Sequence, residues 1–159
     1  MQLRLGLALC GAALFAAGGF YSAWRMRKRL EGLEIEAEAI RFLRTEISAF
    51  DTALPEALRR LRGENRLLAL SFEQGGGADE DALQKAGRSL QLKKGDLAPL
   101  HSLLRAIPHG ARGETRHFDA ALQDLEAIRL KAAETFSRDG PLHQKLGLLI
   151  GAAAFILLL

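Results

Sequence analysis

Apolar residues are concentrated at the two ends of this chain. Residues 5–24 carry no charge, and as a helix they reach about 30 Å, the thickness of the hydrocarbon core of a bilayer. Residues 146–159 are also uncharged and reach about 21 Å, close to a full span once the preceding turn is included and the Lys145 ammonium extends to the interface. The pattern predicts membrane helices over 1–24 and 146–159, with a domain over 25–145 between them.

The middle domain has the three- and four-residue apolar spacing of amphipathic helices, and no useful length of it alternates as a half-buried strand does. In its first helix the repeated apolar positions are Leu30, Leu33, Ala37, Ile40, Leu43, Ile47 and Phe50. Because this stripe starts where the first apolar segment stops, we expect one unbroken helix from Leu3 to Ala49, about 70 Å long.

Turn and capping residues mark the helices that follow. Thr52 is expected to cap a helix whose first turn holds Pro55. Gly63 then divides the next stretch into helices over 54–62 and 64–73.

The second half of the domain is divided in the same way. The glycines at 75–77 form a flexible turn, and Asp79 begins a helix that runs to about Leu92 and stops at Gly95. Asp96 is expected to cap the helix after it.

The last cytoplasmic helix is expected after a turn at 108–113 and runs from about 114 to 139, with Gly140 and Pro141 at its end or at a kink. Its expected buried residues are Phe118, Leu122, Leu125, Ile128, Ala132 and Phe136.

These elements predict an all-α protein, in which a cytoplasmic antiparallel bundle of about six helices is flanked by the two membrane helices. The first and last cytoplasmic helices should pack together, because their membrane ends both lie at the bilayer. Ile40 and Ile47 are then expected to face Leu125, Ile128 or Ala132.

The charges beside the apolar ends predict the orientation. Arg25, Arg27, Lys28 and Arg29 follow the first apolar segment, and cations at this position oppose its translocation more than the lone Arg4 does on the other side. We therefore expect this segment to be retained with its N-terminus outside. Lys145 directly precedes the second apolar segment and likewise predicts that the middle domain is cytoplasmic.

A different outcome is open for the N-terminal segment. Ala16, Ala17 and Gly18 have the small side chains of a signal-peptidase site. Cleavage there would give an exported helical domain that binds an acidic ligand or a cell-wall polymer outside the membrane.

The net charge and the absence of known motifs argue against several classes of function. The net charge is only +3, and the few aromatic residues form no base-stacking platform, so we expect no nucleic-acid partner. The histidines lack the spacing of a helical zinc site, and Cys10 is the single cysteine. Neither a G-x-S-x-G elbow nor a phosphate-binding loop occurs. We therefore expect no enzyme, with no catalytic, cofactor-binding or metal-binding residue.

Three alternate glutamates, Glu34, Glu36 and Glu38, resemble paired catalytic carboxylates. Two of them fall on the solvated flank of an amphipathic helix, and such charge runs are structural in most proteins. The sequence favours a membrane-tethered interaction or scaffold protein.

One segment carries a family resemblance. The stretch AIRFLRTEISAFDTALPEAL, residues 39–58, resembles the signature of the stage III sporulation protein AB family. GGFYSAWRMRKRLEGL, RHFDAALQDLE and LHQKLGLLIGAAAFILLL are similar to other parts of that family, so the resemblance covers essentially the whole chain. Arg44, Ala53 and the AIPHGARGETRHF turn depart from the family pattern.

The resemblance implies a specific role. The family is similar to the platform subunit of type II secretion systems and belongs to a channel complex between mother cell and forespore. It implies a mother-cell membrane protein facing the forespore, with a secretion-type sporulation ATPase and other stage III subunits as partners. Its oligomeric state, homo-oligomers included, stays open.

Five residues of the signature stretch are candidates for a partner surface or for a structural corner: Thr45, Glu46, Thr52, Pro55 and Glu56. Thr52 and Pro55 have a local structural role, which favours the corner. Glu46 has no capping role, so it faces either a buried arginine or a partner.

Overall fold

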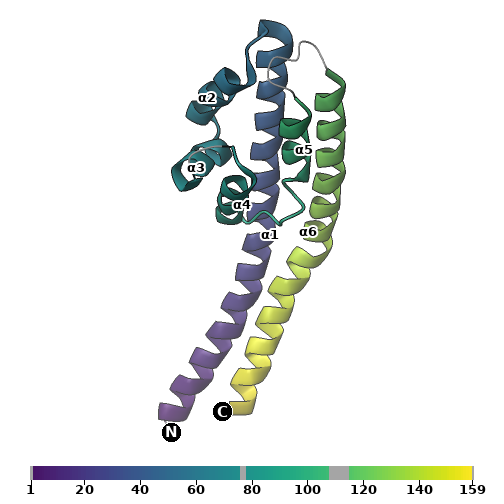
Figure 1. The fold of residues 1–159 in the computed structure, drawn as a ribbon. Coiled ribbons are helices and arrows are strands. Elements are labelled where there is room, and N and C mark those ends of the chain that lie inside the picture. The colour runs from purple at the N-terminus through teal and green to yellow at the C-terminus, as the bar shows by residue number, and fades with distance from the viewer. Residues whose placement is uncertain (1, 76–77, 108–114, 159) are drawn as a thin grey trace. The chain divides into compact units, whose positions relative to one another are not determined.

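The structure, a computed structural model, describes residues 2–75, 78–107 and 115–158, and describes side chains for 9–73, 78–107 and 115–157. These residues form helices and connecting turns without a strand, which confirms the all-α class (Figure 1). The six helices in the described residues are α1 (Gln2–Phe50), α2 (Leu54–Glu64), α3 (Arg66–Gly75), α4 (Glu80–Ser89), α5 (Ala98–Ala106) and α6 (Thr115–Leu158).

The chain divides into two compact units. One comprises residues 1–27 and 132–159, and the other comprises residues 28–131. Helices α1 and α6 contribute to both units, whereas α2 to α5 belong to the second. The expected boundaries after residues 24 and 145 and the antiparallel bundle stay predictions.

The expected unbroken first helix is confirmed, because α1 is a single helix of 49 residues. It ends after Phe50 where Asp51 has a φ of 51°, and the Thr52 N–H donates to the Glu46 carbonyl at 3.0 Å. Most of the expected apolar stripe is buried, but Phe50 is 67% exposed. Phe50 continues the apolar spacing but is exposed, because the chain reverses directly after it.

The division between α2 and α3 lies at Asn65 and not at Gly63. Asn65 is buried; its amide donates to the Ile35 carbonyl at 2.8 Å, and its side-chain oxygen accepts the N–H groups of Leu67 and Leu68 at 3.0 and 3.4 Å. The side chain thus caps α3 and ties it to α1. Asparagine is a common cap, but a glycine two residues earlier is the stronger turn signal in the sequence.

Helix α4 begins after Asp79, as expected, although the Asp79 side chain makes no capping hydrogen bond. It ends at Ser89, earlier than the expected Leu92. Gln91 has a φ of 62°, and the Leu92 and Gln91 N–H groups donate to the carbonyls of Gly87 and Arg88 at 2.9 and 3.0 Å. This is a Schellman ending with glutamine in the position that glycine usually holds, so no glycine in the sequence signals this end of the helix.

The core of the second unit is built from leucines and isoleucines of α1 to α5 together with α6. Its most deeply buried large side chains are Leu33, Ile40, Leu43, Leu61, Leu67, Leu68, Leu83, Leu97, Leu100, Leu103, Phe118 and Leu125. Within this unit, α1 and α6 are joined by ion pairs from Arg44 to Asp119 at 3.1 Å and from Arg129 to Glu34.

Helix α6 continues through Gly140 and Pro141, so it does not end there, and the alternative expectation of a kink stays a prediction. Proline lacks an N–H, which removes one helical hydrogen bond but does not stop the helix here. The turn expected at 108–113, the helix start near 114 and the 76–77 part of the glycine turn lie outside the described residues.

In the first unit, α1 and α6 meet through glycines. A Cβ atom on Gly19 would lie 2.5 Å from the His143 carbonyl oxygen, and one on Gly147 would lie 2.9 Å from the Phe15 oxygen. One on Gly151 would lie 2.8 Å from the Ala12 oxygen. Large apolar side chains point outward instead; among them Leu14 is 74% exposed. Small residues between helices and large apolar residues outside are typical of paired membrane helices.

Among the described residues one helix is long and apolar enough to cross a membrane by length and composition, α6 over Thr115–Leu157. The expected N-terminal membrane helix includes residues 1–8, whose side chains lie outside the described part, and it stays a prediction.

Candidate functional site

A stripe on α1 receives the turn between α4 and α5. Its residues are Arg29, Gly32 and Glu36, spaced three and four apart so that they lie on one helix face. Arg29 makes a two-pronged ion pair with Asp96, in which Nε donates to Oδ2 and a terminal guanidinium nitrogen donates to Oδ1, both at 2.7 Å. We call this α1 stripe, with Asp96 and Leu100, the α5 dock.

Gly32 lets the turn approach the α1 backbone. A Cβ atom at this position would lie 3.0 Å from both the Leu90 carbonyl oxygen and a methyl group of Leu92. The absence of a side chain therefore allows the end of α4 to lie directly on α1.

Glu36 lies at the start of α5. Its side chain is completely buried, and its Oε1 accepts the Leu100 N–H at 3.4 Å, in the first turn of α5. That N–H has no partner within the helix, so a carboxyl group from α1 supplies the cap that Asp96 was expected to give. The Glu36 Oε2 atom is buried without a hydrogen-bond partner in the described part of the chain.

The electrostatics of the dock follow from this burial. Loss of hydration raises the pKa of Glu36 to about 8, an effect opposed by the Leu100 N–H and increased by the nearby Asp96 charge. Burial also acts to raise the pKa of Asp96, but the Arg29 hydrogen bond, the Lys93 N–H and the positive charges outweigh it and lower that pKa. The hydrogen bond to Asp96 raises the pKa of Arg29. The dock thus holds one charged pair beside one carboxyl group that favours its neutral form.

The carboxyl group of Asp96 is therefore not a helix cap, contrary to expectation. It accepts the Lys93 N–H at 2.9 Å and binds Arg29, and α5 begins after Leu97. The sequence offered one signal for Glu36, which follows Leu33 by three residues and precedes Ile40 by four and so lies on the apolar face of the helix. Glu34 and Glu38, by contrast, are half-buried and exposed, as the solvated flank predicts.

The second cluster is the corner between α1 and α2. Glu46 Oε2 accepts from the Thr52 hydroxyl and from Arg60, both at 3.0 Å. Glu56 pairs with Arg60 at 3.4 Å and with Arg59. Thr52 thus bonds to Glu46 and does not cap α2, whose N-cap is Ala53.

The exposed side of that corner carries the other predicted residues. Thr45 is exposed and its hydroxyl donates to the Arg41 carbonyl at 3.1 Å. Pro55 is exposed in the first turn of α2, as expected. Phe50 lies between them in the sequence and is an exposed aromatic residue.

The residues predicted to set the topology have different environments. Arg25, Arg27 and Lys145 are exposed, and Lys28 pairs with Glu31 at 2.6 Å. Arg29, in contrast, belongs to the α5 dock.

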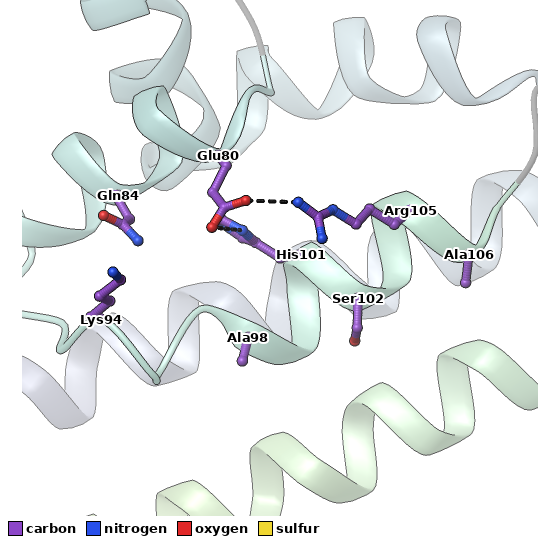
Figure 2. A pocket seen from close by; sticks show the side chains of 8 residues that line it. All are labelled: Glu80, Gln84, Lys94, Ala98, His101, Ser102, Arg105 and Ala106. Carbon is purple, nitrogen blue, oxygen red and sulfur yellow. Dashed lines mark hydrogen bonds and ion pairs between the residues drawn. The ribbon is translucent and has the colours of Figure 1, made fainter.

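A cleft of about 530 Å³ lies between α4 and α5 (Figure 2). Glu80 of α4 reaches across to Arg105 at 2.9 Å and to His101 Nδ1 at 3.9 Å. Burial lowers the pKa of His101, an effect that the Glu80 charge opposes and the Arg105 charge reinforces. Within the described residues, no group of three or more His, Cys, Asp or Glu side chains is arranged to hold a metal ion.

Comparison with known proteins gives a family. The model of the family described as stage III sporulation protein AB matches residues 4–159. No curated protein and no solved structure matches the chain. The match extends over nearly the full sequence and confirms the resemblance carried by residues 39–58. The chain therefore belongs to the stage III sporulation protein AB family.

Proposed function

We propose that this sporulation-related protein is a non-catalytic membrane platform subunit of the channel complex between mother cell and forespore. Its α1 and C-terminal α6 segments lie in the mother-cell membrane that faces the forespore, and its second unit docks a cytoplasmic secretion-type ATPase. The other stage III subunits are its partners in the membrane.

The observation that carries the proposal is the continuity of α1. One helix of 49 residues runs from the apolar N-terminal segment, through the α5 dock, to the corner before α2. A helix resists bending over this length far better than a loop does, so a load applied at the corner is carried along α1 toward the N-terminal segment. The outward-facing large apolar residues of the first unit support its position in lipid.

We place the docking surface at the corner of α1 and α2. Among the described residues of the second unit, two large apolar side chains are exposed, Phe50 at 67% and Leu130 at 63%. Phe50 lies five residues from each of the exposed Thr45 and Pro55, and the Glu46–Arg60 pair joins the two helices of the corner. Aromatic residues are frequent anchors of protein interfaces, which favours Phe50 over Leu130.

The test compares two substitutions in the full-length protein. Phe50→Ser should weaken binding of the sporulation ATPase at least about tenfold, whereas Leu130→Ser, a matched loss of exposed apolar surface, should change it little. Binding is measured with the purified ATPase and with the protein in lipid nanodiscs. Equal effects of the two substitutions would move the docking surface away from the corner, and no binding by the unaltered protein would overturn the proposed function.

A further inference from the structure

The turn between α4 and α5 has a fixed conformation. Its start is the Schellman ending of α4 around Gln91, and its end is held by the Asp96 carboxyl group, which accepts the Lys93 N–H. Both ends are thus closed by hydrogen bonds. Side chains on the turn are therefore presented in a defined position.

The turn is fixed to α1 close to the expected membrane boundary. Arg29 binds Asp96 through two hydrogen bonds, and Gly32 contacts the turn through the Leu90 carbonyl. Along α1, Arg29 lies five residues after residue 24, where the expected membrane helix ends, which is about 7.5 Å of helix. This length is below the Debye length of about 8 Å at physiological ionic strength, so charges at this height still sense an anionic lipid surface.

The exposed charges of the turn are positive. Arg88 in the last turn of α4, Lys93 and Lys94 are exposed. The acidic residues of α4, Glu80 and Asp81, are in its first turn, and Glu80 lines the α4–α5 cleft together with Lys94 (Figure 2). Asp96, the carboxyl group of the turn itself, is buried and paired with Arg29. The turn therefore presents cations without an exposed acid between them.

We propose that this turn is a second membrane contact, in which Arg88, Lys93 and Lys94 bind the headgroups of anionic phospholipids in the bilayer that holds the N-terminal helix. The Arg29–Asp96 pair positions the turn for this contact and does not itself bind lipid. The proposal rests on the membrane position of α1 in the proposed function, but it does not depend on ATPase docking. Each cation near an anionic surface contributes about fivefold in binding.

The experiment uses the full-length protein with Cys10 replaced by serine and a fluorescent label on Gly95→Cys. Gly95 is exposed and has no atom within 4 Å of the position of a Cβ, so a label fits there. The protein is placed in nanodiscs of phosphatidylcholine alone or of phosphatidylcholine with phosphatidylglycerol, each with a nitroxide-headgroup lipid as quencher. Quenching should be stronger in the anionic discs, and added salt should reduce the difference.

Two matched controls accompany it. A label on Gly63→Cys, equally exposed and equally free of neighbours, should be quenched little in either disc. The double variant Lys93→Gln and Lys94→Gln should lower the ratio of proteins whose turn contacts the lipid to those whose turn does not by about 25-fold. The control Arg62→Gln with Arg66→Gln removes the same charge from α2 and α3 and should leave this ratio unchanged.

Equal quenching of the Gly95 label in neutral and anionic discs overturns the proposal. This comparison uses the protein with its lysines intact, so it does not depend on whether the lysine variant folds. Unchanged quenching in the lysine variant also overturns it. If the lysine variant instead loses ATPase binding while lipid composition has no effect, the turn contacts a protein. A failure of ATPase binding with intact lipid-dependent quenching refutes the proposed function and leaves this inference standing.

Discussion

At the scale of single residues, Glu36 has an unusual environment for a carboxyl group. It is completely buried, it caps α5 from another helix, and one of its oxygens has no partner in the described part of the chain. A buried carboxyl group in this position is more stable with its proton, which is why its pKa rises to about 8. The fold therefore binds a proton that the unfolded chain has released at neutral pH.

This linkage predicts how stability depends on pH. The stabilisation from protonated Glu36 is complete below the unfolded pKa of about 4.5 and is lost as pH rises through the folded pKa of about 8. The contribution falls by at most about 1.4 kcal/mol per pH unit. Glu36→Gln removes this dependence, so the variant should gain stability relative to the unaltered protein between pH 5 and pH 9.

The measurement is thermal unfolding of both proteins in detergent, followed by circular dichroism across that pH range. Glu38→Gln is the matched control, because Glu38 is exposed on the same helix. Its pH profile should follow that of the unaltered protein. A parallel profile for Glu36→Gln would contradict the linkage.

Glu36 shows which features of the candidate site the sequence does not predict. Glu36 is one of three similar glutamates. Its spacing from Leu33 and Ile40 places it on the apolar face, but only the position of α5 shows that it caps another helix. Phe50 illustrates the opposite error, because it continues the apolar period but lies where the backbone reverses at Asp51. Periodicity predicts which face of a helix is apolar, and the end of the helix decides whether that face still has a neighbour.

At the scale of elements, the long helices were predictable and the short ones were less so. α1 has no proline or cap signal before residue 50, so its length follows from its sequence. The ends of α3, α4 and α5 depend on the Asn65 contact with α1, on a left-handed glutamine and on a cap from Glu36. Two of these three features are contacts between distant segments, which local sequence does not encode.

The glycine contacts of the first unit give a prediction about α1 and α6. A larger side chain at Gly147 would meet the Phe15 oxygen and the Gly19 backbone, so Gly147→Leu should separate the two helices. Spin labels on Ala13→Cys and Leu149→Cys report this separation, because both residues are exposed and neither replaces an interface glycine. In a protein with Cys10→Ser, the distance between the labels should lengthen and its distribution should broaden with Gly147→Leu.

Gly18→Leu is the matched control for this experiment. A Cβ on Gly18 meets no atom within 4 Å, so the distance between the labels should stay as in the unaltered protein. Equal lengthening in both variants would indicate a general effect of leucine in this segment. An unchanged distance with Gly147→Leu would show that the glycines do not set the helix pairing.

At the scale of the whole molecule, the proposed function depends on how the second unit is attached. Both of its long helices continue, without a break in the described residues, into the apolar first unit. A flexible tether would be enough to keep a docking surface near a membrane. Two continuous helices are instead suited to transmit a displacement, because their backbone hydrogen bonds resist extension and bending.

A protein that only recruits the ATPase can therefore be distinguished by experiment from one that passes the motion of the ATPase to the membrane. A fragment of residues 25–145 should fold as a helical domain and bind the sporulation ATPase, because it retains the α5 dock and the corner at Phe50. It should nevertheless fail to replace the full-length protein, and so should a chain that lacks only residues 146–159. Spore counts in cells that carry each form are the measurement, and development should stall after engulfment. A detached domain can recruit the ATPase but cannot pass its motion to the membrane. If the fragment without the apolar ends restores normal spore counts, coupling to the membrane is therefore not required, and the protein acts as a soluble adaptor.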